Sequence, residues 1–382
     1  MSDVLDRPMT ASAADTAVPI VIAAGGTGGH FFPAEALAAE LMARGHQVVL
    51  MTDARSGALA SPVFRDAETY VLQGAGIAGR GAMRGMQAAL ALARGTMEAR
   101  RLLSRLRPAV VVAFGGYPSV PPVLAARMVT GARPRVVLHE QNAVLGRANR
   151  LLARFADAIA LGMAATTRLP ARPASTVTGN PVRPAIQALA GHAYHPPSDD
   201  EPLRLLVTGG SLGARVFSDV VPAAIALLPP ALRSRLHVVQ QCRSEDLDRV
   251  RAAYAVLSIP AELSAFFPDM AARLDAAHMV IARAGASTVA EIAAVGRPAI
   301  LVPLPNAIDG HQARNAAAID AWVLDQAEFE RAPAVLAAAL CDALSCADTM
   351  AMRAYAIAAH GRPDAAAALA DLVESHAQRT HA

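Results

Sequence analysis

Two glycine-rich turns, one in each half of the chain, most strongly constrain how this sequence can fold. Residues 25–29 follow an apolar run of strand length at residues 20–24 and precede a helical pattern that opens at Pro33. Residues 209–213 follow a second apolar run and precede a second helical pattern. Such turns let backbone N–H groups and a helix N-terminus approach an anionic ligand. The repeat predicts two similar domains that face each other, with ligands in the cleft between their strand ends.

His30 stands at the mouth of the first turn, beside whatever binds there. The alternative is a tight strand-to-helix loop that carries a surface histidine. Asp53 ends the next predicted strand, and an acid about 20 residues beyond a glycine turn binds ribose in NAD enzymes. That fingerprint needs GxGxxG, and Phe31 occupies its third glycine position. Asp53 is therefore predicted to be a strand-end loop residue.

The composition excludes several classes of protein. The 382 residues suggest two or three domains, and the apolar content of 54% is ample for two cores. A net charge of +3 is too small to argue for nucleic acid. The absence of lysine excludes Schiff-base chemistry and the lysine-dependent P-loop. The three cysteines form no metal-ligand set and indicate a reducing compartment.

The N-terminal segment and the length of the apolar runs bear on where the protein is located. Residues 1–17 are polar and acidic, which predicts a disordered tail in place of a signal peptide. No uninterrupted apolar run approaches the ~20 residues that span a bilayer. These features predict a protein that is soluble or at most peripheral to a membrane.

Residues 74–107 combine apolar side chains with seven arginines and a single acid, Glu98. An ordinary amphipathic helix with a solvated basic face explains this pattern. The alternative is a surface that rests on anionic lipid headgroups, where each arginine contributes about 1 kcal/mol.

Predicted strands alternate with helices along the whole chain, which indicates α/β domains with doubly wound parallel sheets. Polar clusters at residues 115–119 and 139–142 follow predicted strands, where such folds bind ligands. The proline-rich residues 191–202 mark the passage into the second domain. Residues 350–377 are predicted to be helical and to reach back to the first domain.

The second half holds two acidic motifs. Asp246 and Asp248 form a DxD, but they lie on a charged helix, so a solvated face is preferred to a metal site. Residues 279–291 predict strand, glycine turn and helix start, with Ser287 or Thr288 able to cap the helix. Glu291 can accept two ribose hydroxyls there, or it can be an acid favoured by the helix dipole.

Taken together, these motifs resemble those of the MurG family, in the family's order over about residues 20–316. The matching segments are GGTGGHFFP, GGYPS, HEQNA with a later Asn149, GNPVR, TGGSLGAR, ARAGASTVAE and GRPAILVPLPNAIDGHQARNA. The resemblance implies the GT-B fold, with an acceptor domain at residues 18–181 joined by a helix at about 358–382. It implies a UDP-GlcNAc-binding domain at residues 182–357.

The resemblance implies roles residue by residue. The implied catalytic residues are His30, Tyr117 and Asn142. The implied acceptor-binding residues are Gly28, Gly29, His30, Tyr117, Ser119, Glu140, Gln141 and Asn142. The implied donor-binding residues are Thr27, Gly28, Gly29, Asn142, Arg183, Ser211, Phe267, Ala286, Ser287, Thr288, Val289, Ala290, Glu291 and Gln312.

Within the donor set, Ser211 would touch phosphate, Glu291 the ribose hydroxyls and Gln312 the sugar. The backbone of Phe267 would contact uracil.

Two positions depart from the family pattern. Pro118 and Val120 stand in a segment that usually reads GGYVSGP, so Val120 removes a flexible glycine from the acceptor loop. Leu212 stands where glutamine is common, which removes one polar contact to the donor.

The implied reaction is an inverting transfer of GlcNAc from UDP-GlcNAc to the 4-hydroxyl of the MurNAc unit of lipid I. Imidazole titrates near neutral pH, so His30 is the predicted general base; the alternative is a residue that positions the acceptor diphosphate. Neither metal nor cofactor is implied. The family places the enzyme peripherally on the cytoplasmic face of the bacterial inner membrane, with possible partners among cell-wall synthesis or division proteins.

Three other classes stay open. They are another GT-B enzyme such as a UDP-GlcNAc 2-epimerase, an NAD oxidoreductase and a non-catalytic nucleotide-sugar binder.

Overall fold

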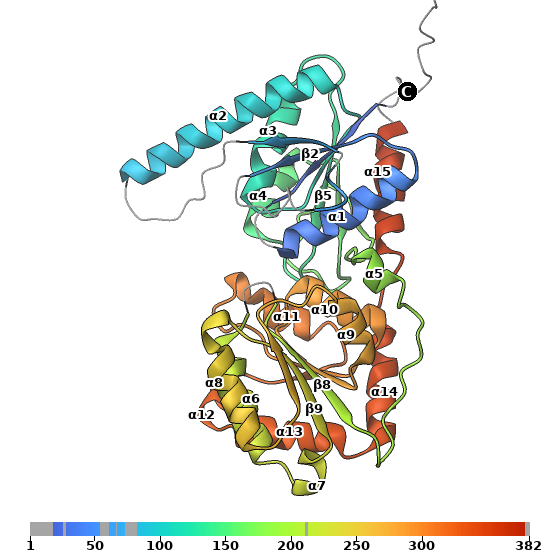
Figure 1. Cartoon of the computed structure of the whole chain (residues 1–382). Coiled ribbons are helices and arrows are strands. Elements are labelled where there is room, and N and C mark those ends of the chain that lie inside the picture. The colour runs from blue at the N-terminus through green and yellow to red at the C-terminus, as the bar shows by residue number, and fades with distance from the viewer. Residues whose placement is uncertain are drawn as a thin grey trace, which may run out of the picture.

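Two parallel β-sheets form the centres of two domains (Figure 1). The computed structural model describes residues 18–25, 28–53, 61–65, 67–72, 82–210 and 213–378. The predicted tail at residues 1–17 lies outside this description. The prediction of an α/β protein with two doubly wound parallel sheets is confirmed.

Within the described residues, the first sheet has seven strands in the order β3-β2-β1-β4-β5-β6-β7. Their bounds are β1 Ile20–Ala23, β2 Val48–Thr52, β3 Glu68–Val71, β4 Val110–Ala113, β5 Arg135–Glu140, β6 Ala158–Leu161 and β7 Ser175–Val177. The strand order reverses between β1 and β4, so the first glycine turn leaves β1 beside the switch point where such sheets bind ligands.

The second sheet repeats this arrangement with six strands in the order β10-β9-β8-β11-β12-β13. Their bounds are β8 Leu203–Thr208, β9 Leu236–Gln241, β10 Ala261–Ser264, β11 Met279–Ala282, β12 Ala299–Leu301 and β13 Trp322–Val323. Here the order reverses between β8 and β11, and the second glycine turn follows β8.

The central strands β1, β4 and β11 are apolar along their whole length, as expected where helices cover both faces of the sheet. Ile20 and Ile22 of β1 pack in one core, whereas Val21 and Ala23 pack in the core on the opposite face. In the first domain these covering helices are α1 Gly28–Ala43, α2 Ala82–Leu106, α3 Val120–Met128 and α4 Arg147–Leu152.

The second domain begins close to the short α5, at residues Pro184–Gln187. Its helices are α6 Arg215–Ala226, α7 Pro230–Arg233, α8 Leu247–Val256, α9 Met270–Ala276, α10 Ala286–Val295, α11 His311–Ala316, α12 Gln326–Arg331, α13 Ala334–Leu344 and α14 Ala347–Ala358. Val182 and Ile186 pack in a core of this domain, and the boundary at residue 182 stays a prediction.

The last helix, α15 Ala365–Gln378, returns to the first domain, as the sequence predicts. Leu369 and Val373 pack in the same core as Leu37 and Leu41 of α1. The predicted continuous helix is in fact two helices, because α14 ends at Ala358 and α15 starts at Ala365. The break lets the chain cross from one domain to the other.

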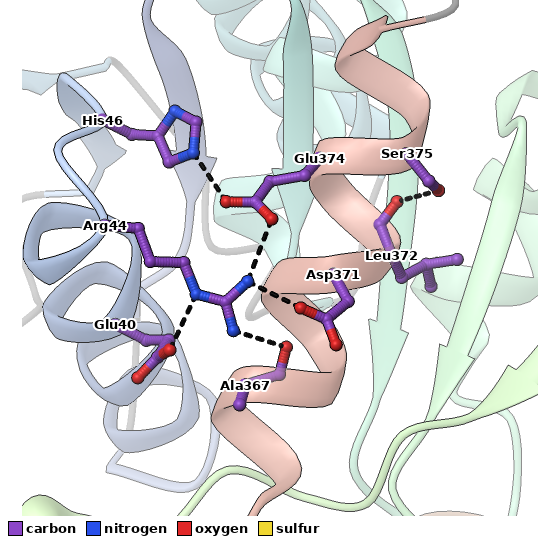
Figure 2. Close-up of polar contacts among 8 residues, drawn as sticks. All are labelled: Glu40, Arg44, His46, Ala367, Asp371, Leu372, Glu374 and Ser375. Carbon is purple, nitrogen blue, oxygen red and sulfur yellow. Dashed lines mark hydrogen bonds and ion pairs between the residues drawn. The ribbon is translucent and has the colours of Figure 1, made fainter.

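Arg44 anchors α15 to the end of α1, as Figure 2 shows. Its guanidinium lies 2.6 Å from Asp371, 2.9 Å from Glu374 and 2.8 Å from Glu40. His46 also contacts Glu374, at 2.7 Å. The returning helix is therefore held by an apolar face and by a network of charges at its rim.

Two predicted helix starts are wrong. α1 begins at Gly28, so Pro33 does not open it but lies in its second turn. Proline lacks the N–H that would bond the Gly29 carbonyl four residues earlier, and Ser287 Oγ of the second domain lies 3.5 Å from that carbonyl. Neither Ser287 nor Thr288 caps α10, because Gly285 is its N-cap residue and no side chain caps it.

The DxD lies only partly on a solvated face. Asp246 is buried and bonds Arg249 at 2.8 Å, whereas Asp248 is fully exposed beside Arg251. Asp53 lies just beyond the end of β2, as predicted.

Candidate active site

A cavity of about 960 Å³ lies between the two domains. Its lining comes largely from segments at or beyond the carboxyl ends of β1 and β5 in the first sheet and of all six strands, β8 to β13, in the second. In the first domain the lining residues are Gly29, His30, Phe32, Gln141 and Asn142. The prediction of a cleft between the strand ends of two facing domains is confirmed.

His30 lies at the start of α1 with its ring orientation set by the backbone. Nδ1 lies 2.8 Å from the carbonyl oxygen of Phe114, which can only accept, so Nδ1 carries the proton. In the neutral ring Nε2 is then the acceptor. A Cβ at Gly116, where φ is +69°, would lie 3.8 Å from Nε2. His30 therefore lines the cavity with Nε2 as its acceptor nitrogen, beside the glycine turn after β4.

The loop after β5 is organised by the buried carboxylate of Glu140. One oxygen accepts from the backbone N–H of Asn142 at 3.1 Å and from its side-chain Nδ2 at 3.0 Å. The other accepts from Gly146 N at 2.8 Å and Asn149 Nδ2 at 2.9 Å. Glu140 thus shapes the loop from beneath, while Gln141 and Asn142 reach the cavity.

Gln141 shares an anchor with His30. Its Nε2 donates to the Phe114 carbonyl at 2.8 Å, so one oxygen fixes two cavity residues. Beside them, Ser119 is fully buried and donates to Gly115 O at 2.8 Å. Tyr117 is 45% exposed and stands outside the cavity lining.

Arg183 and Glu291 form an ion pair in the cavity wall. Arg183 Nε lies 2.8 Å from Glu291 Oε1, and the Arg183 guanidinium lies 5.2 Å from the ring centre of Phe32 in the first domain. Burial raises the pKa of Glu291, and the charge of Arg183 opposes that rise. The pair supplies a carboxylate that is fixed in position and directed to the cavity.

The first turn of α10 brings Ala286, Ser287 and Thr288 to the cavity. Val289 and Ala290 instead pack against the apolar core beside the sheet. Gln312 lines the cavity, and its Oε1 accepts from Leu304 N at 2.9 Å.

Phe267 also lines the cavity, and the Arg273 guanidinium stacks 4.1 Å from its ring centre. Thr27 and Ser211 lie outside the described residues, and of Gly28 only the helical backbone is described.

Sequence reasoning missed several polar residues that line the cavity: Arg215, Asp219, Gln241, Arg243, Arg283, Gln326 and Glu330. Gln241 accepts from Thr208 Oγ1 at 2.9 Å and from Gly209 N at 3.2 Å, and so supports the second glycine turn. Arg283 is buried, which lowers its pKa, and donates to Gln326 Oε1 at 2.7 Å. Gln241 ends β9 and Arg283 directly follows β11, so sequence reasoning could have found these two residues from their position at strand ends.

The described residues include no group of three or more His, Cys, Asp or Glu that is placed to hold a metal ion. Within the same part of the chain, no single helix is long and apolar enough to cross a membrane. The bent pair α13 and α14 passes that test only when its two helices are taken together. Leu336 and Leu340 of α13 are buried in the core of the second domain.

Comparison with known proteins assigns the class. Residues 20–161 match the model of the glycosyltransferase family 28 N-terminal domain, and residues 204–369 match that of its C-terminal domain. With two facing parallel-sheet domains around a cleft, the chain is a glycosyltransferase with the GT-B fold.

The relatives narrow this class. One relative is the UDP-N-acetylglucosamine–N-acetylmuramyl-(pentapeptide) pyrophosphoryl-undecaprenol N-acetylglucosamine transferase of Granulibacter bethesdensis. The two chains are 60% identical over 360 residues, and this alignment covers 93% of each chain. The crystal structure of Acinetobacter baumannii MurG superposes with a TM-score of 0.73 at 30% identity, covering 93% of this chain and 99% of that one. The chain belongs to the MurG family.

A putative UDP-N-acetylglucosamine 2-epimerase from Listeria monocytogenes superposes with a TM-score of 0.63 at 15% identity, covering 95% of this chain and 98% of that one. At that identity the likeness shows the fold alone.

Proposed function

We propose that this chain transfers the N-acetylglucosaminyl group of UDP-GlcNAc to the 4-hydroxyl of the MurNAc unit of lipid I, forming lipid II. The observation that carries the proposal is the 60% identity, over almost the whole chain, to a relative named for this transfer. The cavity between the domains supplies the site, with polar side chains from both halves.

The reaction is a single inverting displacement. The 4-hydroxyl oxygen of the acceptor attacks the anomeric carbon and forms the new glycosidic bond, while the bond from that carbon to the diphosphate breaks. His30 Nε2 takes the hydroxyl proton, because Nδ1 is committed to the Phe114 carbonyl. A base in this position contributes typically 10²- to 10⁴-fold. Asn142 lines the same cavity as His30 and orients the acceptor.

The departing UDP carries the negative charge to the second domain. A Cβ at Gly209 would lie only 2.2 Å from Ala214 N, so glycine is required where this turn folds back on itself. Gly213 and Ala214 line the cavity at the N-terminus of α6, which favours an anionic group, and Arg183 adds a positive charge in the same cavity. Glu291 accepts the ribose hydroxyls, and Gln312 contacts the sugar.

The acceptor is lipid-linked, and α2 offers a surface for its membrane. Figure 1 shows this helix extending beyond the rest of the first domain. Met86, Leu90 and Met97 are exposed along α2 at helical spacing, together with Arg94 and Arg101. Apolar side chains among arginines suit the headgroup region of an anionic bilayer. We place the enzyme peripherally on the cytoplasmic face of the bacterial inner membrane, near other cell-wall synthesis or division proteins.

Incubation with labelled UDP-GlcNAc and lipid I tests the proposal. Transfer produces a labelled disaccharide lipid and free UDP. A new free sugar would instead indicate an epimerase, and tight binding without turnover would indicate a nucleotide-sugar sensor.

A further inference from the structure

The two domains meet at the side chain of Asn315, which lies on α11 and is fully buried. Its Oδ1 accepts from the backbone N–H of Ala143 in the first domain at 2.8 Å. Its Nδ2 donates to the side-chain Oδ1 of Asn142 at 3.1 Å and to the Ala284 carbonyl of its own domain at 3.0 Å. Asn315 therefore holds the loop that carries Asn142 against the second domain.

These hydrogen bonds have a fixed direction. The Glu140 carboxylate can only accept, so it requires the amino group of Asn142 on its side. The carbonyl oxygen of Asn142 then faces Asn315, which must present its own amino group. Because Ala143 N–H can only donate, it receives the Asn315 oxygen. The orientation of each side-chain amide thus follows from a neighbour that can only donate or only accept a hydrogen bond.

We propose that Asn315 is a positioning residue that orients Asn142 across the domain interface, so that the acceptor side of the site is complete only when the domains meet. The expected effect on the rate of sugar transfer rests on the proposed function. The hydrogen bonds to Asn142 and Ala143 cross between domains, so separation of the domains breaks both. Asn142 then loses the partner that orients its carbonyl oxygen.

A second interdomain contact provides a comparison. Asp309 of the second domain pairs with Arg150 at 2.8 Å and with Arg168 at 2.9 Å, both in the first domain. These ion pairs hold the domains together without contacting Asn142. Asp309→Asn weakens the domain contact generally, whereas Asn315→Asp removes the orientation of Asn142.

Asn315→Asp is the direct test. It preserves shape but sets a carboxylate oxygen against the Asn142 and Ala284 carbonyl oxygens, which leaves buried acceptors facing one another. We expect kcat for transfer to fall about 10- to 100-fold, with UDP binding by calorimetry changed less than about threefold. Asn306→Asp makes the same change at an exposed site of the adjacent loop, and kcat stays near the wild-type value.

A double variant separates positioning from general damage. If Asn315 acts through Asn142, adding Asn315→Asp to Asn142→Ala lowers kcat by less than about twofold further. Multiplicative losses would overturn the proposal, as would an Asp309→Asn variant with the same kinetic profile as Asn315→Asp.

Small-angle scattering gives a readout that does not depend on transfer. Asn315→Asp is expected to increase the radius of gyration of the folded protein, and an unchanged value would overturn the interdomain contact. If the wild-type protein transferred no sugar, the proposed function would fail while this measurement still tested the contact.

Discussion

Arg183 Nε lies 2.8 Å from Glu291 Oε1, and this pair joins the segment that enters the second domain to α10 in the cavity wall. The Glu291 carboxyl is buried, and burial raises its pKa, while Arg183 favours the ionised form. The ion pair therefore fixes a buried carboxyl group in place, and Arg183 partly offsets the effect of burial, where the ribose of the donor is proposed to bind.

Glu291→Gln is expected to raise KM for UDP-GlcNAc about 10- to 100-fold, because hydrogen bonds to a charged group contribute roughly 1.5–3 kcal/mol. Steady-state kinetics at saturating lipid I measure the change. Glu245→Gln, at an exposed residue before α8, serves as the control and leaves KM unchanged. An unaltered KM in Glu291→Gln would mean that Glu291 is only an acid favoured by the helix dipole.

His30→Ala is expected to lower kcat by about 10² to 10⁴, because the general base is lost while the donor site remains. The comparison is His237→Ala, at an exposed histidine of β9, with near-native turnover. If His30 instead positions the acceptor diphosphate, KM for lipid I rises and kcat is retained. That result would reject the assignment of His30 as base.

Arg94→Gln with Arg101→Gln is expected to weaken sedimentation with anionic liposomes by about 30-fold, since each arginine near such a surface contributes about 1 kcal/mol. Arg251→Gln with Arg331→Gln removes the same charge from the second domain and leaves binding as in wild type. Equal binding by the two double variants would show that α2 is an ordinary solvated helix.

His139 makes folding stability depend on pH. Its ring is fully buried, which lowers its pKa to about 4, and its Nε2 lies 3.3 Å from Gly179 O. The nearby His30 lowers this pKa further. In the unfolded chain a histidine takes up a proton near pH 6.5. The unfolded state thus binds more protons between these pH values, and stability contributed by neutral His139 is present above about pH 6.5 and lost toward pH 4.

The wild-type free energy of unfolding is expected to lose about 3 kcal/mol from this group over that range. His139→Phe lacks the titration, so urea denaturation at pH 7 and pH 4.5 gives a smaller difference for the variant. His237→Ala retains the wild-type difference. Identical pH dependence in His139→Phe would contradict the burial of a neutral ring.

Gly179→Ala tests the crossing of the chain between domains. A Cβ there would lie 2.7 Å from Arg362 Cβ and 2.9 Å from Ala365 Cβ, at the start of α15. We expect a loss of about 2–5 kcal/mol in the free energy of unfolding, from backbone strain and overpacking together. Gly191→Ala has nearly the same φ, +84° against +86°, and an open surrounding, so it costs about 1–2 kcal/mol. Equal losses would show that α15 does not press on Gly179.

The central strands were predictable because each is a short apolar run between polar turns. The edge strands β3, β7, β10 and β13 were not, since they are short and largely exposed, with no apolar run to mark them. The start of α1 was also misjudged, because proline usually marks a first turn and here lies in the second.

The candidate site was predictable where motifs carry it, as at His30 and Glu291. Asn315 was not singled out, because its role needs an amide of the other domain within 3.1 Å. Glu140 stood in the expected motif, but only its hydrogen bonds reveal that it supports the loop beneath the cavity.

The sequence alone predicted two facing domains and the polar residues at their strand ends, because hydrophobic periodicity, glycine turns and ordered motifs are local properties of the chain. Tertiary structure decided which of these residues meet. Arg183 and Glu291 lie 108 positions apart in the sequence, and Asn315 and Asn142 lie 173 positions apart. Such separations leave no local pattern. Packing within the second domain brings the first pair within hydrogen-bonding range, and packing of one domain against the other does so for the second pair.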